Sequence, residues 1–345
     1  MEVINTSSLN RETYEISLQY SLVFEAALGI AAVTNDSLIQ TLEEPWQGKR
    51  STFSEPLQHQ LDHVQTYNTW KALLQLAHAA KSTTIEEWQT FVQGLSDNHL
   101  KQHCLPFMRK MERQVYDLAA LGEEAAIEEL YLRAEGHPFY PGYIQYVVDA
   151  DAGELKRGLL EVMTLWWDEV IVPEQDELSS VLKRDFETKS QMSDRMHPEE
   201  FVKWATQGRE YLPEPSVLTV LLIPHVSYRP WNVEADLPHT KVIYYPVAKE
   251  SLEPDGEEPQ DQLVRPLKAL GDGKRLLILK KLNDQPQTLK DLTHDLEMGK
   301  TTIHHHLKTM KAARVIKQDG AVYAVNWSVL SQIQANLEQY LKGVR

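Results

Sequence analysis

The most constraining feature of the chain is its last quarter, where amphipathic segments are followed by a hairpin pattern. Residues 272–282 and 299–311 carry apolar side chains at helical spacing, and a shorter segment of the same kind opens at Thr288. Residues 315–325 then form two strand-like runs around an Asp-Gly turn. Three helices followed by a β-hairpin is the order of elements in a winged helix-turn-helix, so we predict this fold for residues 262–345.

The third predicted helix has two different faces. At about 100° per residue, Ile303, Leu307 and Met310 fall on one side, and only polar residues or alanine fall opposite them. In a helix-turn-helix the apolar face docks on the domain core and the polar face enters the major groove of DNA. We therefore expect base, sugar or phosphate contacts from eight residues of this helix and the following wing: Lys300, Thr301, Thr302, His304, His305, Lys308, Lys311 and Lys317.

Charge divides the chain at the same place. Residues 262–345 carry 14 Lys and Arg against 7 Asp and Glu, whereas residues 1–261 carry 21 against 43, and the formal net charge of −15 hides this contrast. DNA affinity comes largely from Lys and Arg that displace condensed counterions. The basic carboxy-terminal part is therefore the part expected to bind double-stranded DNA.

The same tract resembles the ArsR family of transcriptional regulators. Its opening, Leu267-Lys-Ala-Leu-Gly-Asp-Gly-Lys-Arg275, is similar to the family's Leu-x-x-Leu-x-Asp-Pro-x-Arg, with Gly273 where the family commonly has proline. Residues 301–308, Thr-Thr-Ile-His-His-His-Leu-Lys, are similar to the family's Ser-x-x-His-His-Leu-Lys recognition helix. The resemblance covers the last quarter of the chain and implies a DNA-binding transcription regulator.

The run of three histidines, residues 304–306, does not predict a metal site. Consecutive helical residues point about 100° apart, whereas helical metal ligands are spaced three or four residues apart. The resemblance implies that metal-sensing relatives use cysteines in the first helix of the motif, or acidic and histidine ligands on the terminal helix. The corresponding stretches here, 289–296 and 328–343, hold no cysteine and a single histidine, His294. We expect neither a metal nor a cofactor.

The acidic remainder, residues 1–250, is predicted to be mainly helical. Strand-like segments at 14–20, 217–223 and 241–247 are expected to pair in a small antiparallel sheet, so the fold class is α+β, mostly α. The acidic, turn-rich residues 251–261 are predicted to be a linker to the winged helix. Helices are expected at 22–32, from Thr83 or Thr84, and at 105–121, 123–134, 154–172 and 174–190, with loops at 137–142 and 224–238.

The large part also faintly resembles an uncharacterised domain that precedes ArsR-like modules in some bacterial regulators. The resemblance rests on Trp166-Trp-Asp-Glu169 and on residues 223–231, Ile-Pro-His-Val-Ser-Tyr-Arg-Pro-Trp, and it implies no known ligand. An arginine could pair with an anionic group while the aromatic rings enclose an apolar one. Packing within a loop is the alternative interpretation. The ligand-binding candidates are Trp166, His225, Tyr228, Arg229 and Trp231.

The terminal helix suggests how the chain assembles. Val329, Ile333, Leu337, Tyr340 and Leu341 form one apolar stripe, which favours a homodimer over simple packing within its own domain. A two-fold dimer would read a pseudo-palindromic operator. We expect the large part to sense an unidentified effector, for which a small molecule is the candidate, or to mediate assembly. An enzyme, or a protein-interaction adaptor, with a tethered winged helix is the alternative function.

The remaining patterns concern location and catalysis. The amino terminus lacks the basic start and apolar core of a secretory signal, and the longest apolar stretches are too short to span a bilayer, so we expect a cytoplasmic protein without a membrane partner. A single cysteine, Cys104, excludes an internal disulfide. Phosphate-loop, nucleophile-elbow and dinucleotide motifs are absent from the sequence, so we expect no enzymatic activity.

Overall fold

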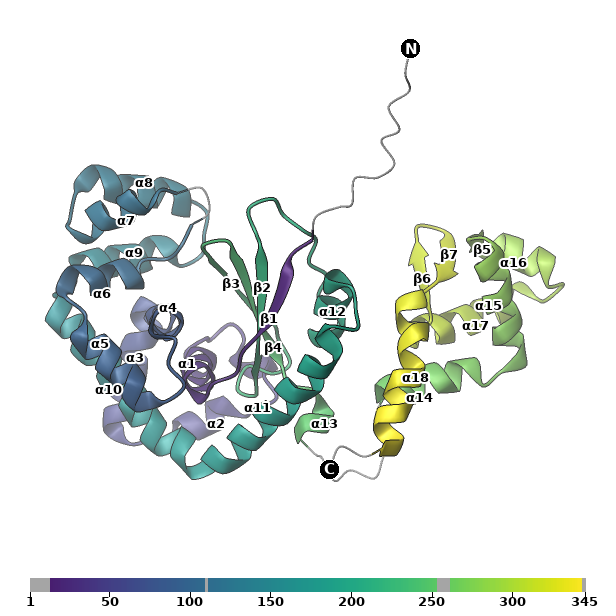
Figure 1. Cartoon of the computed structure of the whole chain (residues 1–345), viewed down its shortest axis with the longest axis horizontal. Coiled ribbons are helices and arrows are strands. Elements are labelled where there is room, and N and C mark those ends of the chain that lie inside the picture. The colour runs from purple at the N-terminus through teal and green to yellow at the C-terminus, as the bar shows by residue number, and fades with distance from the viewer. Residues whose placement is uncertain (1–12, 109–110, 253–260, 343–345) are drawn as a thin grey trace, which may run out of the picture. The chain divides into compact units, whose positions relative to one another are not determined.

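The computed structural model of the chain describes residues 13–108, 111–252 and 261–342 (Figure 1). These fall into two compact units, Met1–Leu252 and Glu253–Arg345, each considered by itself below. Helices predominate in both units and each contains one small sheet, so the predicted fold class, mostly α, is confirmed. Most of the predicted linker, residues 253–260, lies outside the described residues.

The large unit is built mainly from helices. They are α1 (Leu22–Val33), α2 (Trp46–Arg50), α3 (Glu55–Tyr67), α4 (Trp70–Ala80), α5 (Ile85–Gly94), α6 (Asp97–Cys104), α7 (Arg113–Ala120), α8 (Glu124–Ala134), α9 (Tyr140–Asp149), α10 (Ala152–Trp166), α11 (Val172–Ser193), α12 (Pro198–Ala205) and α13 (Lys249–Leu252). A π-helical turn, Trp167–Ile171, joins α10 to α11 without a break. The two helices predicted at 154–172 and 174–190 therefore form one continuous run.

Two helical predictions for this unit are wrong. Residues 105–121 do not form one helix, because Leu105 is already extended and Pro106 follows it, a context that disfavours the α-helical conformation. The predicted loop at 137–142 is partly helical, because α9 begins at Tyr140 with Pro141 in its first turn, where the missing N–H costs nothing.

A four-stranded sheet crosses the large unit. Its strands, in the order β1-β2-β4-β3, are β1 (Glu15–Leu18), β2 (Thr219–His225), β3 (Val233–Leu237) and β4 (Thr240–Pro246). The β1–β2 and β2–β4 pairs are parallel and only β3–β4 is antiparallel, so the predicted antiparallel sheet is wrong. The error comes from β3, which lies in the predicted loop 224–238 and forms a hairpin that places β4 parallel to β2.

The sheet is covered by helices on both faces, because alternate residues of β4 enter different cores. Val242 and Tyr244 pack with α1 and the helices around it, whereas Ile243 and Tyr245 pack with α12. In Figure 1, α1 and α4 lie on one side of the sheet and α12 lies on the other. Helix α1 is buried along almost its whole length and forms the centre of the larger core.

Close packing of α1 on α10 gives a stability prediction. A Cβ atom at Gly29 would lie 2.7 Å from Cζ2 of Trp166, a fully buried ring that also contacts Trp46 and Phe53. Gly29→Ala is expected to lower the free energy of unfolding by about 1–3 kcal/mol, because the indole cannot move without disturbing its neighbours. Urea unfolding followed by tryptophan fluorescence would measure the change.

Gly158 on α10 is the matched control. An added Cβ there meets nothing within 4 Å, so Gly158→Ala is expected to raise the free energy of unfolding by about 1 kcal/mol, as alanine is the better helix former. Changes of the same sign at both glycines would contradict the packing argument.

The small unit has the predicted order of three helices and a hairpin, with additions. Its elements are α14 (Asp261–Leu270), α15 (Gly273–Asp284), β5 (Gln287–Thr288), α16 (Leu289–Asp295), α17 (Lys300–Ala312), β6 (Ile316–Asp319), β7 (Val322–Val325) and α18 (Trp327–Lys342). The sequence did not predict α14 or β5, which adds a third strand to the hairpin in the order β5-β7-β6. Within the described ranges of both units, every helix falls short of the length or apolarity that a bilayer span requires.

Candidate nucleic-acid interface

Helix α17 presents one face to the core of the small unit and one to solvent. Ile303, Leu307 and Met310 are at most 1% exposed and pack with residues of α15 and α16. The three histidines separate as the helical projection requires, because His304 and His305 are exposed and His306 is buried. The predicted orientation of α17 is thereby confirmed.

Helix α16, the first helix of the helix-turn-helix, is fixed at its start by reciprocal hydrogen bonds. The hydroxyl of Thr288 accepts from the backbone N–H of Asp291 at 3.3 Å, and the Asp291 carboxylate accepts from the backbone N–H of Thr288 at 3.0 Å. The Thr288 hydroxyl also donates to this carboxylate at 2.7 Å, and this hydrogen bond, together with the one from the Thr288 backbone N–H, holds the pKa of Asp291 below its usual range. Leu292 then buries the inner face of α16 against α17. The two helices are therefore held as a pair.

Asp272 and Arg275 have a structural role that the sequence did not reveal. The Asp272 carboxylate accepts from the backbone N–H groups of Lys274 and Arg275, both at 3.0 Å, and so caps α15. The Arg275 guanidinium donates to the carbonyl oxygens of Ala269 at 2.6 Å and Lys268 at 2.8 Å, at the end of α14. These two residues of the ArsR-like motif therefore fix the turn between α14 and α15.

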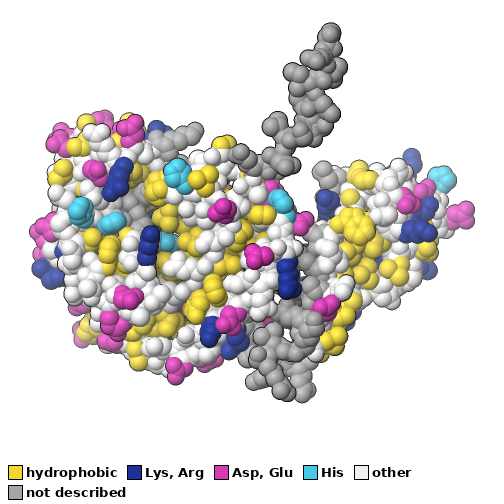
Figure 2. Space-filling view, in the orientation of Figure 1, with side chains coloured by type: hydrophobic (Ala, Val, Ile, Leu, Met, Phe, Trp, Pro, Cys, Tyr) yellow, Lys and Arg dark blue, Asp and Glu magenta, His cyan; other side chains and the backbone are white. Residues whose placement is uncertain are grey.

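The predicted DNA-contacting residues are all at the surface of the small unit. They are Lys300, Thr301, Thr302, His304, His305, Lys308 and Lys311 on α17 and Lys317 on β6, and each is exposed. Lysine, arginine and histidine side chains of this unit are visible in Figure 2. The Lys311 ammonium donates to the side-chain oxygen of Gln318 at 2.8 Å, and Gln318 donates to the Gly320 carbonyl at 2.8 Å. The polar end of α17 is thus tied to the wing.

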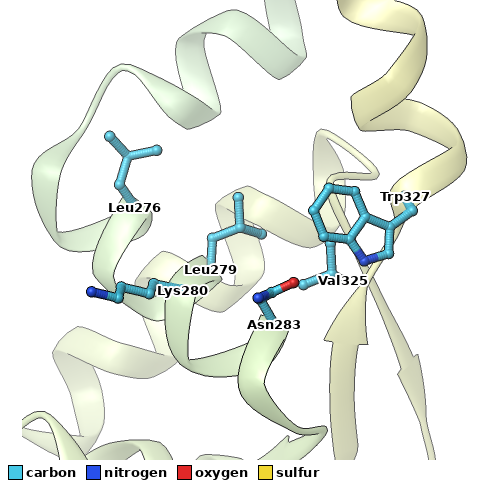
Figure 3. Close-up of a pocket in the computed structure, with 6 residues that line it drawn as sticks. All are labelled: Leu276, Leu279, Lys280, Asn283, Val325 and Trp327. Carbon is cyan, nitrogen blue, oxygen red and sulfur yellow. The ribbon is translucent and has the colours of Figure 1, made fainter.

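The small unit also has an apolar hollow of about 260 Å³, away from these residues. Figure 3 shows it between α15 and the start of α18, where the Trp327 ring, 60% exposed, stands over Val325, Leu279 and Asn283. Leu276 and Lys280 complete the lining. None of the predicted DNA-contacting residues lines this hollow.

The ligand-binding candidates of the large unit are engaged within the fold. The Arg229 guanidinium donates to the Glu43 carboxylate at 2.9 Å and to the Val247 carbonyl, so its charge is partnered. The Tyr228 hydroxyl accepts from the amide of Asn35 at 2.8 Å. These contacts favour the alternative interpretation, packing within the loop.

The other three ligand-binding candidates, His225, Trp231 and Trp166, also make contacts within the fold. His225 is fully buried, with Nε2 3.1 Å from the Trp231 carbonyl oxygen, and burial lowers the pKa of His225 to about 3. The Trp231 indole donates to the Thr41 hydroxyl at 2.9 Å, and Trp166 lies in the core beside Gly29. A hollow of about 350 Å³ elsewhere in the large unit contains none of the five; its lining is Ile85, Glu86, Gln89, Thr164, Trp167, Asp168, Val172 and Gln175.

Comparison with known proteins gives a family match within the small unit. Residues 272–318, from the cap of α15 through α17 and into β6, match the family model of the bacterial regulatory proteins of the arsR family. Comparisons of the chain with curated proteins and with solved structures gave no match. Residues 272–318 are therefore similar to the ArsR-family helix-turn-helix, which suggests DNA-binding transcription regulation.

Proposed function

We propose that the protein is a transcription regulator that binds a pseudo-palindromic operator in double-stranded DNA as a homodimer and responds to a small-molecule effector. The observation that carries the proposal is the two-faced helix α17, whose apolar side is buried and whose basic, hydroxyl-bearing side is exposed within the ArsR-family match. Side chains of this kind suit the base edges and phosphates of a major groove. The acidic large unit would bind the effector.

Exposed apolar side chains on the terminal helix support the dimer. Leu337, Tyr340 and Leu341 of α18 are 36%, 40% and 72% exposed, and Leu267 of the neighbouring α14 is 39% exposed. A stripe of this kind is costly in water and is typical of an interface between copies. In a two-fold dimer, two copies of α17 would meet major grooves one turn of DNA apart, about 34 Å.

Charge reversal on α18 tests the dimer. Leu337→Glu and Leu341→Glu together are expected to convert a dimer to a monomer in light scattering coupled to gel filtration, because two copies would bury like charges in an apolar seam. Leu132→Glu, at a 67% exposed leucine of α8, is the control and should leave the mass unchanged. A monomeric wild-type protein, or a variant that stays dimeric, would contradict the proposed seam.

Gel retardation with the DNA upstream of the protein's own gene tests the operator. Retardation is expected at low salt, and insertion of half a helical turn between the half-sites is expected to abolish it.

We further propose that the large unit is not an enzyme, since its sequence carries none of the nucleophile, phosphate or dinucleotide motifs. Absence of retardation at low salt would favour an enzyme or a protein-interaction adaptor instead.

A further inference from the structure

Helix α4 carries a polar stripe in the interior of the large unit. Lys71, Gln75 and His78 are spaced by four and three residues, so they lie on one face of the helix. The remaining positions of α4 are mostly buried and apolar, with Ala72, Leu73, Leu74, Leu76 and Ala77 all in the core. Three polar side chains on an inward face are costly unless they have partners.

Lys71 lacks such a partner. Its side chain is buried, with 7% of the residue exposed, and within the described residues no carboxylate or hydrogen-bond acceptor is within reach of its ammonium group. The two other buried lysines differ, because Lys189 is bonded to Asp185 and Lys241 to Glu234, at 2.7 and 2.8 Å. The Lys71 Nζ atom is not among the described side-chain atoms that are fully buried without a partner, so the ammonium keeps some contact with solvent.

The surroundings of Lys71 are aromatic and apolar. Its ammonium lies 6.0 Å from the centre of the Tyr140 ring, which stacks on His137 at 3.6 Å. Ala235 and Leu237 of β3 are partly buried against the same core. Figure 2 shows histidine and apolar side chains together on the surface between the helices α6 to α9 and the sheet.

Neighbouring charges do not neutralise Lys71. Asp236 lies between Ala235 and Leu237 on β3, so its side chain points to the opposite face of the sheet from theirs. There its carboxylate oxygen lies 3.4 Å from the Lys241 ammonium. Burial lowers the pKa of Lys71 to about 8; the Asp236 charge opposes this shift and the Lys241 charge adds to it. Among the described residues, the Lys71 ammonium is therefore held in a poorly solvated position without a carboxylate in direct contact.

The rest of the stripe offers polar groups on the same face of α4 as Lys71. The Gln75 amide donates to the Leu105 carbonyl at 2.5 Å, but its side-chain oxygen is buried without a donor among the described residues. His78 Nε2 lies 2.6 Å from the Tyr244 hydroxyl, and burial, aided by the Lys71 charge, lowers the pKa of His78 to about 3, so this imidazole is neutral. Lys71 and Gln75 are four residues apart, a rise of about 6 Å along the helix axis.

We propose that this face of α4 binds a small organic acid. The ligand's carboxylate pairs with Lys71, its apolar or aromatic body lies against the Tyr140 ring, and an N–H or O–H group donates to Gln75. A small organic acid would then be the effector in the proposed function. Only the regulatory role of this site rests on the proposed function. Binding itself does not depend on DNA.

Titration calorimetry of the full chain with indole-3-acetate tests the site, because this probe has a carboxylate, an aromatic body and an N–H group. Saturable binding is expected, and Lys71→Met is expected to weaken it more than about thirtyfold, the usual effect of removing one partner of a buried ion pair. Lys183→Met, at an exposed lysine of α11, should bind as the wild type does. Tryptamine, with the same ring and a cationic group, should not bind.

Two further measurements keep the proposal falsifiable. Without ligand, Lys71→Met is expected to melt at a higher temperature than the wild type, because it removes an unpaired buried charge. Above pH 8, where Lys71 loses its proton, affinity for the probe is expected to fall about tenfold per pH unit. A lower melting temperature for Lys71→Met, no binding of the probe, or binding that is equal in the wild type and Lys71→Met would overturn the site.

Gel retardation separates this site from the DNA-binding proposal. If indole-3-acetate binds through Lys71 and the upstream DNA is not retarded, the organic-acid site stands and the proposed regulatory function fails. If the DNA is retarded and the probe does not bind, the opposite holds.

Discussion

Replacing Lys300, His305 and Lys308 together by alanine is expected to weaken operator binding by roughly two to three orders of magnitude. The two ammonium groups would each lose a phosphate contact, and the imidazole would lose a base or sugar contact. All three side chains are exposed on the polar face of α17, opposite the buried Leu307. The substitutions therefore remove DNA contacts without touching the core, and the variant should unfold at the same urea concentration as the wild type.

The salt dependence of the same variant gives a second measurement. Each lost phosphate contact lowers the slope of log affinity against log salt by about one, so a dimer that loses two lysines per copy should lose about four. A control variant with Lys183, Lys249 and His99 replaced by alanine carries the same side-chain changes at exposed positions of the large unit. Equal retardation of both variants, or an unchanged salt slope, would exclude α17 as the recognition helix.

The helical spacing of apolar residues was enough to predict which face of α17 is exposed. Its buried residues recur at the helical period, and the small unit has one core for them to enter, so sequence spacing alone separates Ile303 from His304 and His305. The roles of Asp272 and Arg275 could not be predicted in this way. Their partners are backbone groups at a helix end, and such hydrogen bonds leave no periodic signal.

The large unit shows why the rest of the fold was harder to predict. All five residues of β3 are half-buried at the edge of a sheet, and its sequence, Val-Glu-Ala-Asp-Leu, lies between Pro230 and Pro238 in what resembles a loop. Lys71 follows Trp70 at the start of a helix and looks like a surface lysine. Only its burial among helices far apart in the sequence reveals an unpaired charge. The local sequence pattern does not show which polar side chains become buried in the tertiary structure.

A second buried charge lies on α11, which contacts the last helix of the large unit, α13. Asp185 is 1% exposed and accepts from Lys189 at 2.7 Å, from the backbone N–H of Ala248 at 2.8 Å and from the Ser251 hydroxyl at 3.1 Å. The carboxylate thereby joins α11 to the end of β4 and to α13. The Lys189 ammonium also lies 4.6 Å from the centre of the Tyr245 ring.

Asp185→Ala is expected to lower the free energy of unfolding of the large unit by about 3–5 kcal/mol, because it leaves a buried ammonium and a backbone N–H without their acceptor. The control lies on the same helix at the same spacing: Lys183 and Glu187 are 3.8 Å apart and more than half exposed. Glu187→Ala should cost less than about 0.5 kcal/mol, since solvent screens an exposed pair. Urea unfolding of both variants measures the difference, and costs that are alike would show that Asp185 does not hold α13 and β4 to α11.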